Sequence, residues 1–202
     1  MIASRRKEGP SYGGQAGATA LADVLFGDFN PGGRLPVTFY GSDRDLPPFT
    51  DYAMDNRTYR YFKGKPLYPF GYGLSYTTFG YDNLTVEGPM TTSSEITVKA
   101  DVMNLGKVAG DEVVQLYVSR DGKDEPIRSL KGFKRIHLNP GESKTVSFTL
   151  APEDLVIYRL GEGRSVNPGK VNVTVGGGQP GTMAPVISSF VILNGEKYTV
   201  SK

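Results

Sequence analysis

The chain has 202 residues and a formal net charge of +2, from 23 Lys and Arg against 21 Asp and Glu. The positive residues are scattered along the sequence, which argues against a nucleic-acid partner. The absence of cysteine excludes disulfides, thiolate catalysis and cysteine metal sites, and no apolar run approaches the ~18 residues that span a bilayer, so we expect no membrane partner.

Residues 15–26 carry the first periodic pattern and predict a helix. Their apolar side chains recur at three- and four-residue spacing and form one stripe: Ala18, Leu21, Ala22 and Leu25. Residues 34–40 predict a short strand at a sheet edge, because Pro36 cannot donate to a ladder. One helix and one strand cannot bury their apolar faces alone, so we expect this piece to belong to a larger α/β layer.

Residues 41–67 show no clean period and are rich in Asp, Pro and aromatic residues. Within this long connection, residues 56–62 predict a short strand. Residues 68–79 then join two regions with different patterns of apolar and polar residues. Gly71 and Gly73 in this stretch allow backbone conformations that other residues avoid. The aromatic side chains around these glycines predict a loop packed against the domain that follows, and an ordinary aromatic-rich loop is the alternative.

From Phe79 onward the chain is expected to form one β domain. Apolar and polar residues alternate in short segments that are separated by Gly, Pro and Asn turns. Strands are predicted at 96–102, 113–118, 133–136, 146–150, 155–160, 171–175 and 186–193. About seven strands in roughly a hundred residues is the pattern of an immunoglobulin-like sandwich. The fold class is therefore mainly β, with a small α/β remnant and an aromatic linker loop ahead of the sandwich.

Three motifs, in this order along the chain, resemble one enzyme family. They are residues 22–39 (ADVLFGDFNPGGRLPVTF), 67–79 (LYPFGYGLSYTTF) and 110–118 (GDEVVQLYV), the last followed by 130–135 (LKGFKR) and 138–142 (LNPGE). Together they resemble the C-terminal part of glycoside hydrolase family 3, the β-glucosidases and β-xylosidases. This part includes the family's fibronectin type III-like domain.

The resemblance implies three parts: residues 1–40 as the tail of the family's α/β sandwich domain, 41–78 as a linker loop, and 79–202 as the fibronectin type III-like β-sandwich. It also implies that the nucleophilic Asp belongs to an N-terminal barrel and the acid/base Glu to the sandwich domain, ahead of the part retained here. No motif for either occurs in this sequence. We therefore assign no catalytic, cofactor-binding or metal-binding residue and expect no cofactor.

Glycosidases use two carboxyl groups, ~5–5.5 Å apart for retention or ~6.5–9.5 Å for inversion. Three acids lie in a polar loop between strands and are interpreted as a solvated turn: Asp121, Asp124 and Glu125. Four more are interpreted as turn acids that bond to nearby backbone N–H groups: Asp111, Glu112, Glu153 and Asp154. A catalytic pair among these acids is the minor alternative.

His137 is the only histidine, which rules out a two-histidine metal site and favours a surface or strand-end position. The one ligand-binding feature of the sequence is its aromatic cluster: Tyr59, Tyr61, Phe62, Tyr68, Phe70 and Tyr72. Sugars stack on aromatic faces, so a glycan near this loop is one interpretation. Hydrophobic contact between domains is the other, and the absence of Trp favours it.

The resemblance implies a non-catalytic C-terminal fragment of a β-glycoside hydrolase of carbohydrate metabolism. The parent would hydrolyse terminal β-linked glucose or xylose by double displacement, and this part would stabilise and pack on the missing N-terminal catalytic domains. The alternative is a free-standing β-sandwich binding module for glycan or protein. The N-terminus lacks the apolar core of a signal peptide. The location of a parent enzyme, secreted or periplasmic, stays open, because Met1 of a fragment need not be its original start.

Overall fold

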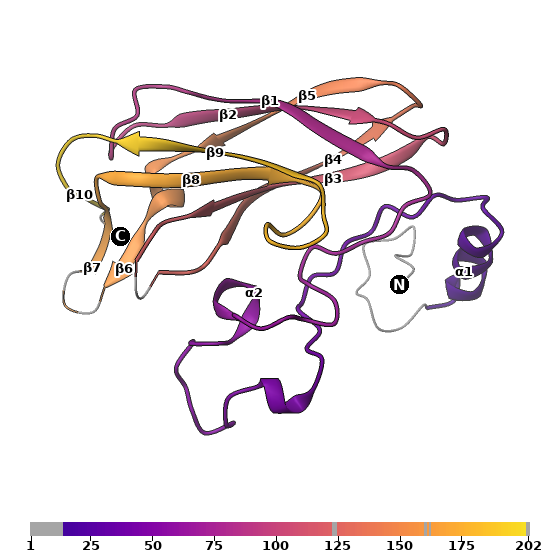
Figure 1. Ribbon diagram of the computed structural model, residues 1–202, viewed down its shortest axis with the longest axis horizontal. Coiled ribbons are helices and arrows are strands. Elements are labelled where there is room, and N and C mark those ends of the chain that lie inside the picture. The colour runs from indigo at the N-terminus through magenta and orange to yellow at the C-terminus, as the bar shows by residue number, and fades with distance from the viewer. Residues whose placement is uncertain (1–13, 123–124, 160, 162, 201–202) are drawn as a thin grey trace.

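The computed structural model describes residues 14–122, 125–159, 161 and 163–200. Within these residues, seven long strands form two antiparallel sheets that lie face to face (Figure 1). One sheet has the order β1-β2-β5: β1 (Phe79–Glu87), β2 (Ile96–Asn104) and β5 (Ser143–Leu150). The other has the order β4-β3-β8-β9: β4 (Ser129–Leu138), β3 (Gly110–Ser119), β8 (Gly169–Gly176) and β9 (Val186–Leu193). The predicted β-sandwich is confirmed.

A smaller sheet of the order β10-β7-β6 closes one end of the sandwich: β6 (Ile157–Arg159), β7 (Gly163–Val166) and β10 (Tyr198–Thr199). A short 3-10 helix, η2 (Pro152–Leu155), precedes it. Of this sheet, only the segment at β6 was predicted. The strands β7 and β10 are too short to leave a readable alternation in the sequence.

The core lies between the two large sheets and follows from the alternation of β2. Every second residue of β2 from Ile96 to Val102 points inward and is buried, whereas the residues that alternate with them are not. They meet inward-facing residues of the opposite sheet, which include Leu116 and Val173. Full burial of each such side chain stabilises the fold by about 1.5–3 kcal/mol, so the sandwich carries its own hydrophobic core.

Strand β3 is buried on both faces, as the apolar run at 113–118 predicts for a central strand. Val114 and Leu116 face the core. Gln115 and Tyr117 alternate with them and are buried beneath the aromatic segment that precedes the sandwich. The sandwich therefore has an outer face that is covered by an earlier part of the chain.

That earlier part, residues 14–78, is called the N-terminal arm below. It holds the helix α1 (Gly17–Leu25), the 3-10 turn η1 (Asp43–Asp45) and the short helix α2 (Thr58–Tyr61). Helix α1 confirms the helix predicted at 15–26. It lies at one end of the molecule, and the loop that carries η1 and α2 projects beneath the sandwich (Figure 1). No helix among the described residues is long and apolar enough to cross a membrane.

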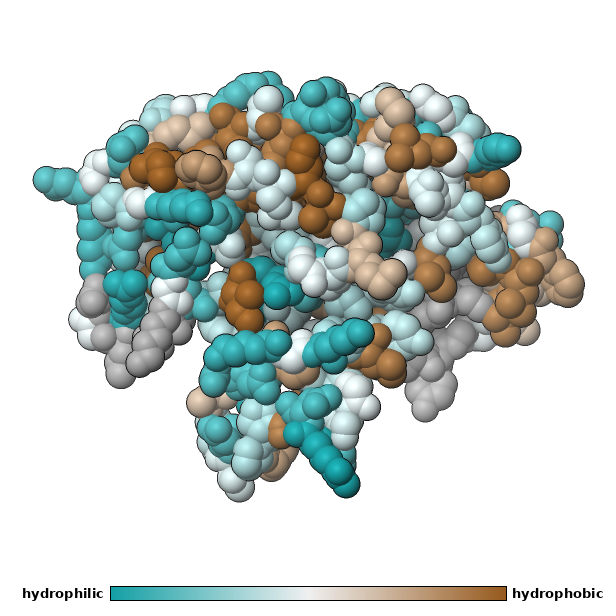
Figure 2. Space-filling view, in the orientation of Figure 1, coloured by the Kyte–Doolittle hydropathy of each residue, from teal (hydrophilic) through white to brown (hydrophobic). Residues whose placement is uncertain are grey.

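The apolar stripe of α1 is not covered. Val24 is buried, but Leu21 is 43% exposed, Leu25 is 68% exposed, and Phe26 just beyond the helix is 84% exposed. Brown apolar atoms gather at this end of the molecule (Figure 2). Exposed apolar patches of this kind are uncommon on isolated soluble domains.

The strand predicted at 34–40 does not form. Phe39 makes a single antiparallel bridge to Tyr68, and the Leu35 amide donates to the Tyr72 carbonyl at 2.8 Å, without a continuous ladder between these points. Pro36 and Pro69 both lack the amide hydrogen that a ladder requires, which explains the interruption. The two segments nevertheless lie side by side.

The strand predicted at 56–62 is also wrong, because its centre forms the helix α2. Asn56 and Thr58 have positive φ angles of 56° and 54°, which turn the chain before the helix. The Asn56 side chain then accepts a bond from the Lys63 amide, and the Phe62 amide donates to the Thr58 carbonyl. Local hydrogen bonding of this kind competes with an extended strand.

Strand β1 was not predicted individually. Its pairing with β2 shifts register between Asp82 and Thr85, and Asn83 has a positive φ of 52°. Such a bulge breaks the alternation of side chains from which a strand is recognised in a sequence.

Candidate functional site

A buried ion pair fastens the N-terminal arm to the sandwich. Arg34 Nη2 lies 2.8 Å from Glu112 Oε2, and the two side chains are only 12% and 3% exposed. The Arg34 guanidinium also donates to the carbonyl oxygen of Gly177 at 3.2 Å. Arg34 is on the arm, Glu112 is on β3, and Gly177 follows β8, so one side chain joins three segments.

Tyr81 completes this polar cluster. Its hydroxyl donates to Glu112 Oε1 at 2.8 Å, so both carboxylate oxygens of Glu112 are bonded. Burial raises the pKa of Tyr81 far above its usual range, and the charge of Glu112 raises it further. The phenol therefore stays a hydrogen-bond donor. A buried carboxylate with all of its oxygens bonded serves as a structural fastening.

Gln115 makes a second connection between the arm and the sandwich. Its side-chain amide donates to the carbonyl of Gly71 at 3.1 Å and to that of Gly177 at 3.2 Å, and it accepts from the Tyr117 hydroxyl at 2.6 Å. Gly71 has a φ of 77°, and a Cβ there would collide with the Gln115 amide oxygen. Only glycine fits this close approach without strain.

The aromatic cluster packs on the sandwich through one stacked pair. Tyr59 stacks on Phe70 with ring centroids 4.2 Å apart, and its edge faces Tyr117 of β3 at 6.3 Å. The Tyr59 hydroxyl accepts a bond from the Leu130 amide of β4 at 3.2 Å. Phe62 is buried against Tyr40 with ring centroids 4.8 Å apart. These rings are used for packing, as the interdomain interpretation predicted.

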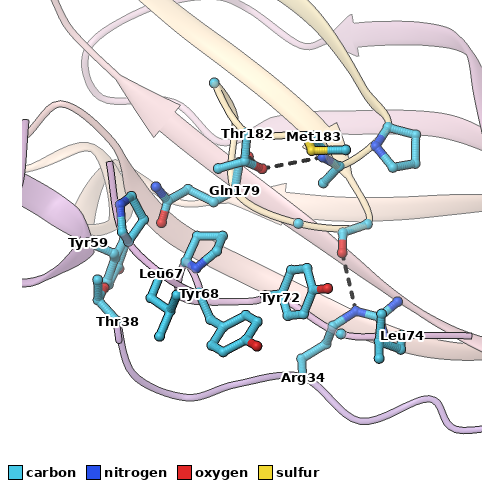
Figure 3. Close-up of a pocket in the computed structure, with 18 of the residues that line it drawn as sticks. Arg34, Thr38, Tyr59, Leu67, Tyr68, Tyr72, Leu74, Gln179, Thr182 and Met183 are labelled. Carbon is cyan, nitrogen blue, oxygen red and sulfur yellow. Dashed lines mark hydrogen bonds between the residues drawn. The ribbon is translucent and has the colours of Figure 1, made fainter. Parts of the chain in front are cut away.

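Tyr68 and Tyr72 lie at a cleft, which the packed rings of Tyr59 and Phe62 also line. The cleft has a volume of about 1190 Å³ and runs between the aromatic part of the arm and the loop of residues 177–185 that joins β8 to β9. Tyr68 and Tyr72 line its floor, Gln179 and Met183 lie on the opposite side, and Arg34 closes one end (Figure 3).

Two polar atoms at the cleft are buried without a partner: the side-chain oxygens of Thr38 and Gln179. Gln179 as a whole is 6% exposed. Buried polar atoms are nearly always bonded to protein or water, so each of these two oxygens calls for a partner such as a water or a ligand group. Neither residue was a candidate in the sequence, because a threonine and a glutamine in loops carry no pattern.

The acids singled out in the sequence lie apart in the structure. Asp121 is 3.9 Å from Lys170, and Glu125 is 3.4 Å from Arg159. Asp124 lies outside the described residues. The Asp154 carboxylate accepts from the Ala151 amide at 3.1 Å, as expected of a turn acid, and Glu153 lies beside it in η2.

The turn interpretation of Glu112 is wrong, because this residue is buried in β3 and paired with Arg34. A glutamate one step from a turn can face inward only where a cation meets it, and the arm supplies that cation from 78 residues away. Asp111 is bonded to side chains instead of turn amides: it accepts from Arg135 and lies 2.7 Å from His137 Nδ1. Among the described residues, no group of three His, Asp or Glu could hold a metal ion.

His137 lies near the end of β4 and is exposed, as predicted. Burial on its own would raise the pKa of its partner Asp111, but the hydrogen bonds from His137 and Arg135 hold that pKa below its usual value. The His137 ring and the Asp111 carboxylate thus form an exposed carboxylate–imidazole contact near the end of β4.

Comparison with known proteins identifies the family profiles and relatives that match the chain. Residues 10–76 match the profile of the glycosyl hydrolase family 3 C-terminal domain, and residues 112–179 match that of the fibronectin type III-like domain. The xylan 1,4-beta-xylosidase of Xylanibacter ruminicola is 44% identical over 167 residues, which cover 82% of this chain and 19% of that protein. The periplasmic beta-glucosidase of Salmonella typhimurium is 40% identical over 180 residues, which cover 82% of this chain and 24% of that protein.

Solved structures give the same result. Beta-glucosidase 3B from Thermotoga neapolitana, in complex with alpha-D-glucose, superposes with a TM-score of 0.79 at 33% identity, over 92% of this chain and 28% of that one. The chain thus spans about a fifth to a quarter of the length of the curated relatives described above. It belongs to glycosyl hydrolase family 3 and corresponds to the C-terminal portion of the family's β-glucosidases and β-xylosidases.

Proposed function

We propose that this chain is the non-catalytic C-terminal portion of a β-glycosidase and that it supports the catalytic domains by packing against them. The parent enzyme would hydrolyse terminal β-linked glucose or xylose. The observation that carries this proposal is the uncovered apolar face of α1 on an arm that is fastened to the sandwich by the buried Arg34–Glu112 pair. Such an arm presents a fixed apolar surface to a neighbouring domain.

The proposed division of labour follows the three parts of the sequence. Residues 1–40 would complete the α/β sandwich domain of the parent, 41–78 would link it to the last domain, and 79–202 would be the fibronectin type III-like sandwich. Glu112, Glu125 and Asp154 are engaged in ion pairs or a turn bond, which supports a chain without a nucleophile or an acid/base residue of its own. A free-standing binding module is not favoured, because an isolated module has no use for an exposed α1 stripe.

Domain replacement in a relative tests the proposal. The region of the Xylanibacter ruminicola enzyme that matches this chain is deleted, and this chain is supplied in its place. Deletion is expected to abolish hydrolysis of an aryl β-xyloside, and replacement is expected to restore it, while this chain alone stays inactive on aryl β-glucosides and β-xylosides. Hydrolysis by the chain alone would overturn the proposal.

A matched pair of variants sharpens the test. The double substitution Leu25→Lys and Phe26→Lys alters the exposed α1 end, and it is expected to reduce the restored activity because charges would replace the apolar contact. Lys107→Gln, at an exposed site in the turn between β2 and β3, is the control and is expected to leave restoration unchanged. Equal activity in both replacements would place the domain contact elsewhere.

We also propose that a glycan binds near the aromatic part of the arm. Tyr68 and Tyr72 line the cleft with their rings 5.3 Å apart, and the orphaned oxygens of Thr38 and Gln179 lie in the same cleft. Aromatic faces beside unpaired polar groups suit a sugar. Titration of the chain with cello- and xylo-oligosaccharides, followed by amide chemical shifts of the arm, tests this second role.

A further inference from the structure

The charges that line the cleft do not balance. Among the described residues that line the cleft, Glu112 is the one acid, and it is already paired with Arg34. Lys63 is paired with Asp55 at 3.1 Å. Within the described residues, Lys65 and Arg128 have no carboxylate at ion-pair distance. The described part of the cleft therefore presents two unpaired cations, Lys65 and Arg128, and no unpaired anion.

Arg128 is the more informative of the two cations. It is half-buried near Tyr117, and burial lowers the pKa of its guanidinium. A cation withdrawn from water without a partner is unfavourable, whereas a lysine at the surface is not. A half-buried guanidinium that opens on a cleft is suited to a carboxylate, which its two parallel N–H groups can bind.

The unpaired side-chain oxygens of Gln179 and Thr38 call for a different ligand group, a hydrogen-bond donor. The amide oxygen of Gln179 can only accept a hydrogen bond, and the Thr38 hydroxyl has no partner either. The terminal torsion of a glutamine is soft, so its amide can turn toward a ligand. A simple anion offers no donor to the Gln179 oxygen, whereas a ligand with hydroxyl or amide groups beside its negative charge would satisfy it.

The walls of the cleft supply the third requirement. Tyr68 is 43% exposed, and the side chains of Leu67 and Met183 are also exposed at the cleft. In Figure 3 Tyr68 and Tyr72 lie on the same side of the cleft, across from Gln179. Pyranose rings present C–H faces that pack on such surfaces. With about 1190 Å³, the cleft has room for more than one sugar ring.

We infer that the cleft binds a saccharide that carries a carboxylate, of the uronic acid class. Arg128 and Lys65 hold the carboxylate, Gln179 and Thr38 take hydroxyl groups, and the rings of Tyr68 and Tyr72 cover a pyranose face. This inference deepens the second role proposed above, because it names the class of glycan. It is independent of the packing role of the arm.

Amide chemical-shift titration of the full chain tests the inference. The probes are methyl β-D-glucuronide, methyl β-D-glucoside, acetate and an acidic tripeptide. The glucuronide is expected to shift amides of residues 63–72 and 177–184 and to bind at least about tenfold more tightly than the glucoside at low salt. Binding is expected to weaken as salt is added, because the guanidinium–carboxylate contact is charged.

Two variants and a control locate the contact. Arg128→Gln is expected to raise the Kd for the glucuronide about tenfold and to remove its advantage over the glucoside. Gln179→Ala is expected to weaken both sugars. Lys107→Gln removes one positive charge outside the cleft and is expected to change neither. Unchanged amide spectra outside the cleft show that each variant keeps its fold.

Four results would overturn the inference: no shift with any sugar, equal binding of glucuronide and glucoside, binding of acetate as strong as that of the glucuronide, or binding of the tripeptide alone. The last would make the cleft a peptide site. None of these results bears on the domain-replacement experiment, so the failure of the cleft and the failure of the packing role can be told apart.

Discussion

The sandwich and the N-terminal arm hold their shapes by different means. The sandwich buries apolar residues from both sheets in one core. The arm buries only three apolar side chains, Val24, Leu35 and Phe62, and is fastened to the sandwich through Arg34, Gln115 and backbone carbonyl groups. The sandwich can therefore fold from its own residues, whereas the arm depends on the sandwich on one side and presents uncovered apolar surface on the other.

The buried ion pair gives the largest expected effect. Glu112→Gln leaves Arg34 charged, buried and without a counter-ion, which typically costs about 3–5 kcal/mol. The free energy of unfolding is measured by urea denaturation. The double substitution Arg34→Met and Glu112→Leu is the control and is expected to cost less than the single one, because it leaves no orphaned charge. A single variant within 0.5 kcal/mol of the parent chain, on the order of a neutral surface change, would show that the pair is not buried in solution.

The core comes next. Leu116→Ala removes a fully buried side chain between the sheets and is expected to lower the free energy of unfolding by about 2–5 kcal/mol. Leu25→Ala removes the same atoms from an exposed helix position and is expected to change it by less than about 0.5 kcal/mol. If both substitutions cost the same, the α1 stripe is already covered in the isolated chain, for example by a second copy.

The glycine contact between the two regions gives an intermediate effect. Gly71→Ala combines a positive φ with a collision against Gln115 and is expected to loosen the arm by about 1–3 kcal/mol. Limited proteolysis of the arm measures this, since cleavage in residues 41–67 should become faster. Gly27→Ala has a similar φ of 86° but open space around its Cβ, and it is expected to cost less. Equal cleavage rates in both variants would contradict a close contact at Gly71.

The exposed end of α1 predicts association of the isolated chain. Its contiguous apolar residues favour contact between copies and binding of an apolar dye. Light scattering across a range of concentrations and dye fluorescence test this, and the double substitution Leu25→Lys and Phe26→Lys is expected to reduce both signals. A chain that stays monomeric at high concentration without binding dye would rule this expectation out.

The smallest expected effect is the pH-dependent contribution of the exposed Asp111 contacts to the free energy of unfolding. The pKa of Asp111 is lowered by His137 and Arg135, so its ion pairs stabilise the fold above the unfolded pKa of about 3.9 and are lost as pH falls through the folded value. Because the pair is exposed, we expect Asp111→Asn to cost less than about 1 kcal/mol at neutral pH. The difference between variant and parent should vanish at low pH, and a difference that grows there would contradict this sign.

Local sequence determined the β-sandwich, the α1 helix and the family. Alternation along β2 and β8, turns at Asn-Pro-Gly and the three-residue spacing in 15–26 are local patterns, and each produced the expected element. Motifs in the family's order were sufficient to identify it. The burial of the run at 113–118 was also readable, because a strand that is covered on both faces is mostly apolar along its length, and Gln115 is the polar exception here.

Tertiary structure decided how the arm is held and where the cleft lies. In the sequence Glu112 resembles a turn acid, but in the structure it pairs with Arg34, which lies 78 positions away in the chain. Prolines at 36 and 69 turned an expected strand into a single bridge, and positive φ angles at Asn56 and Thr58 turned another into a helix. Gln179 and Thr38 become candidates for ligand contact only in the tertiary structure, where the two loops that carry them face each other across the cleft. Contacts between distant segments leave no period in a sequence, because each partner keeps the local pattern of its own segment.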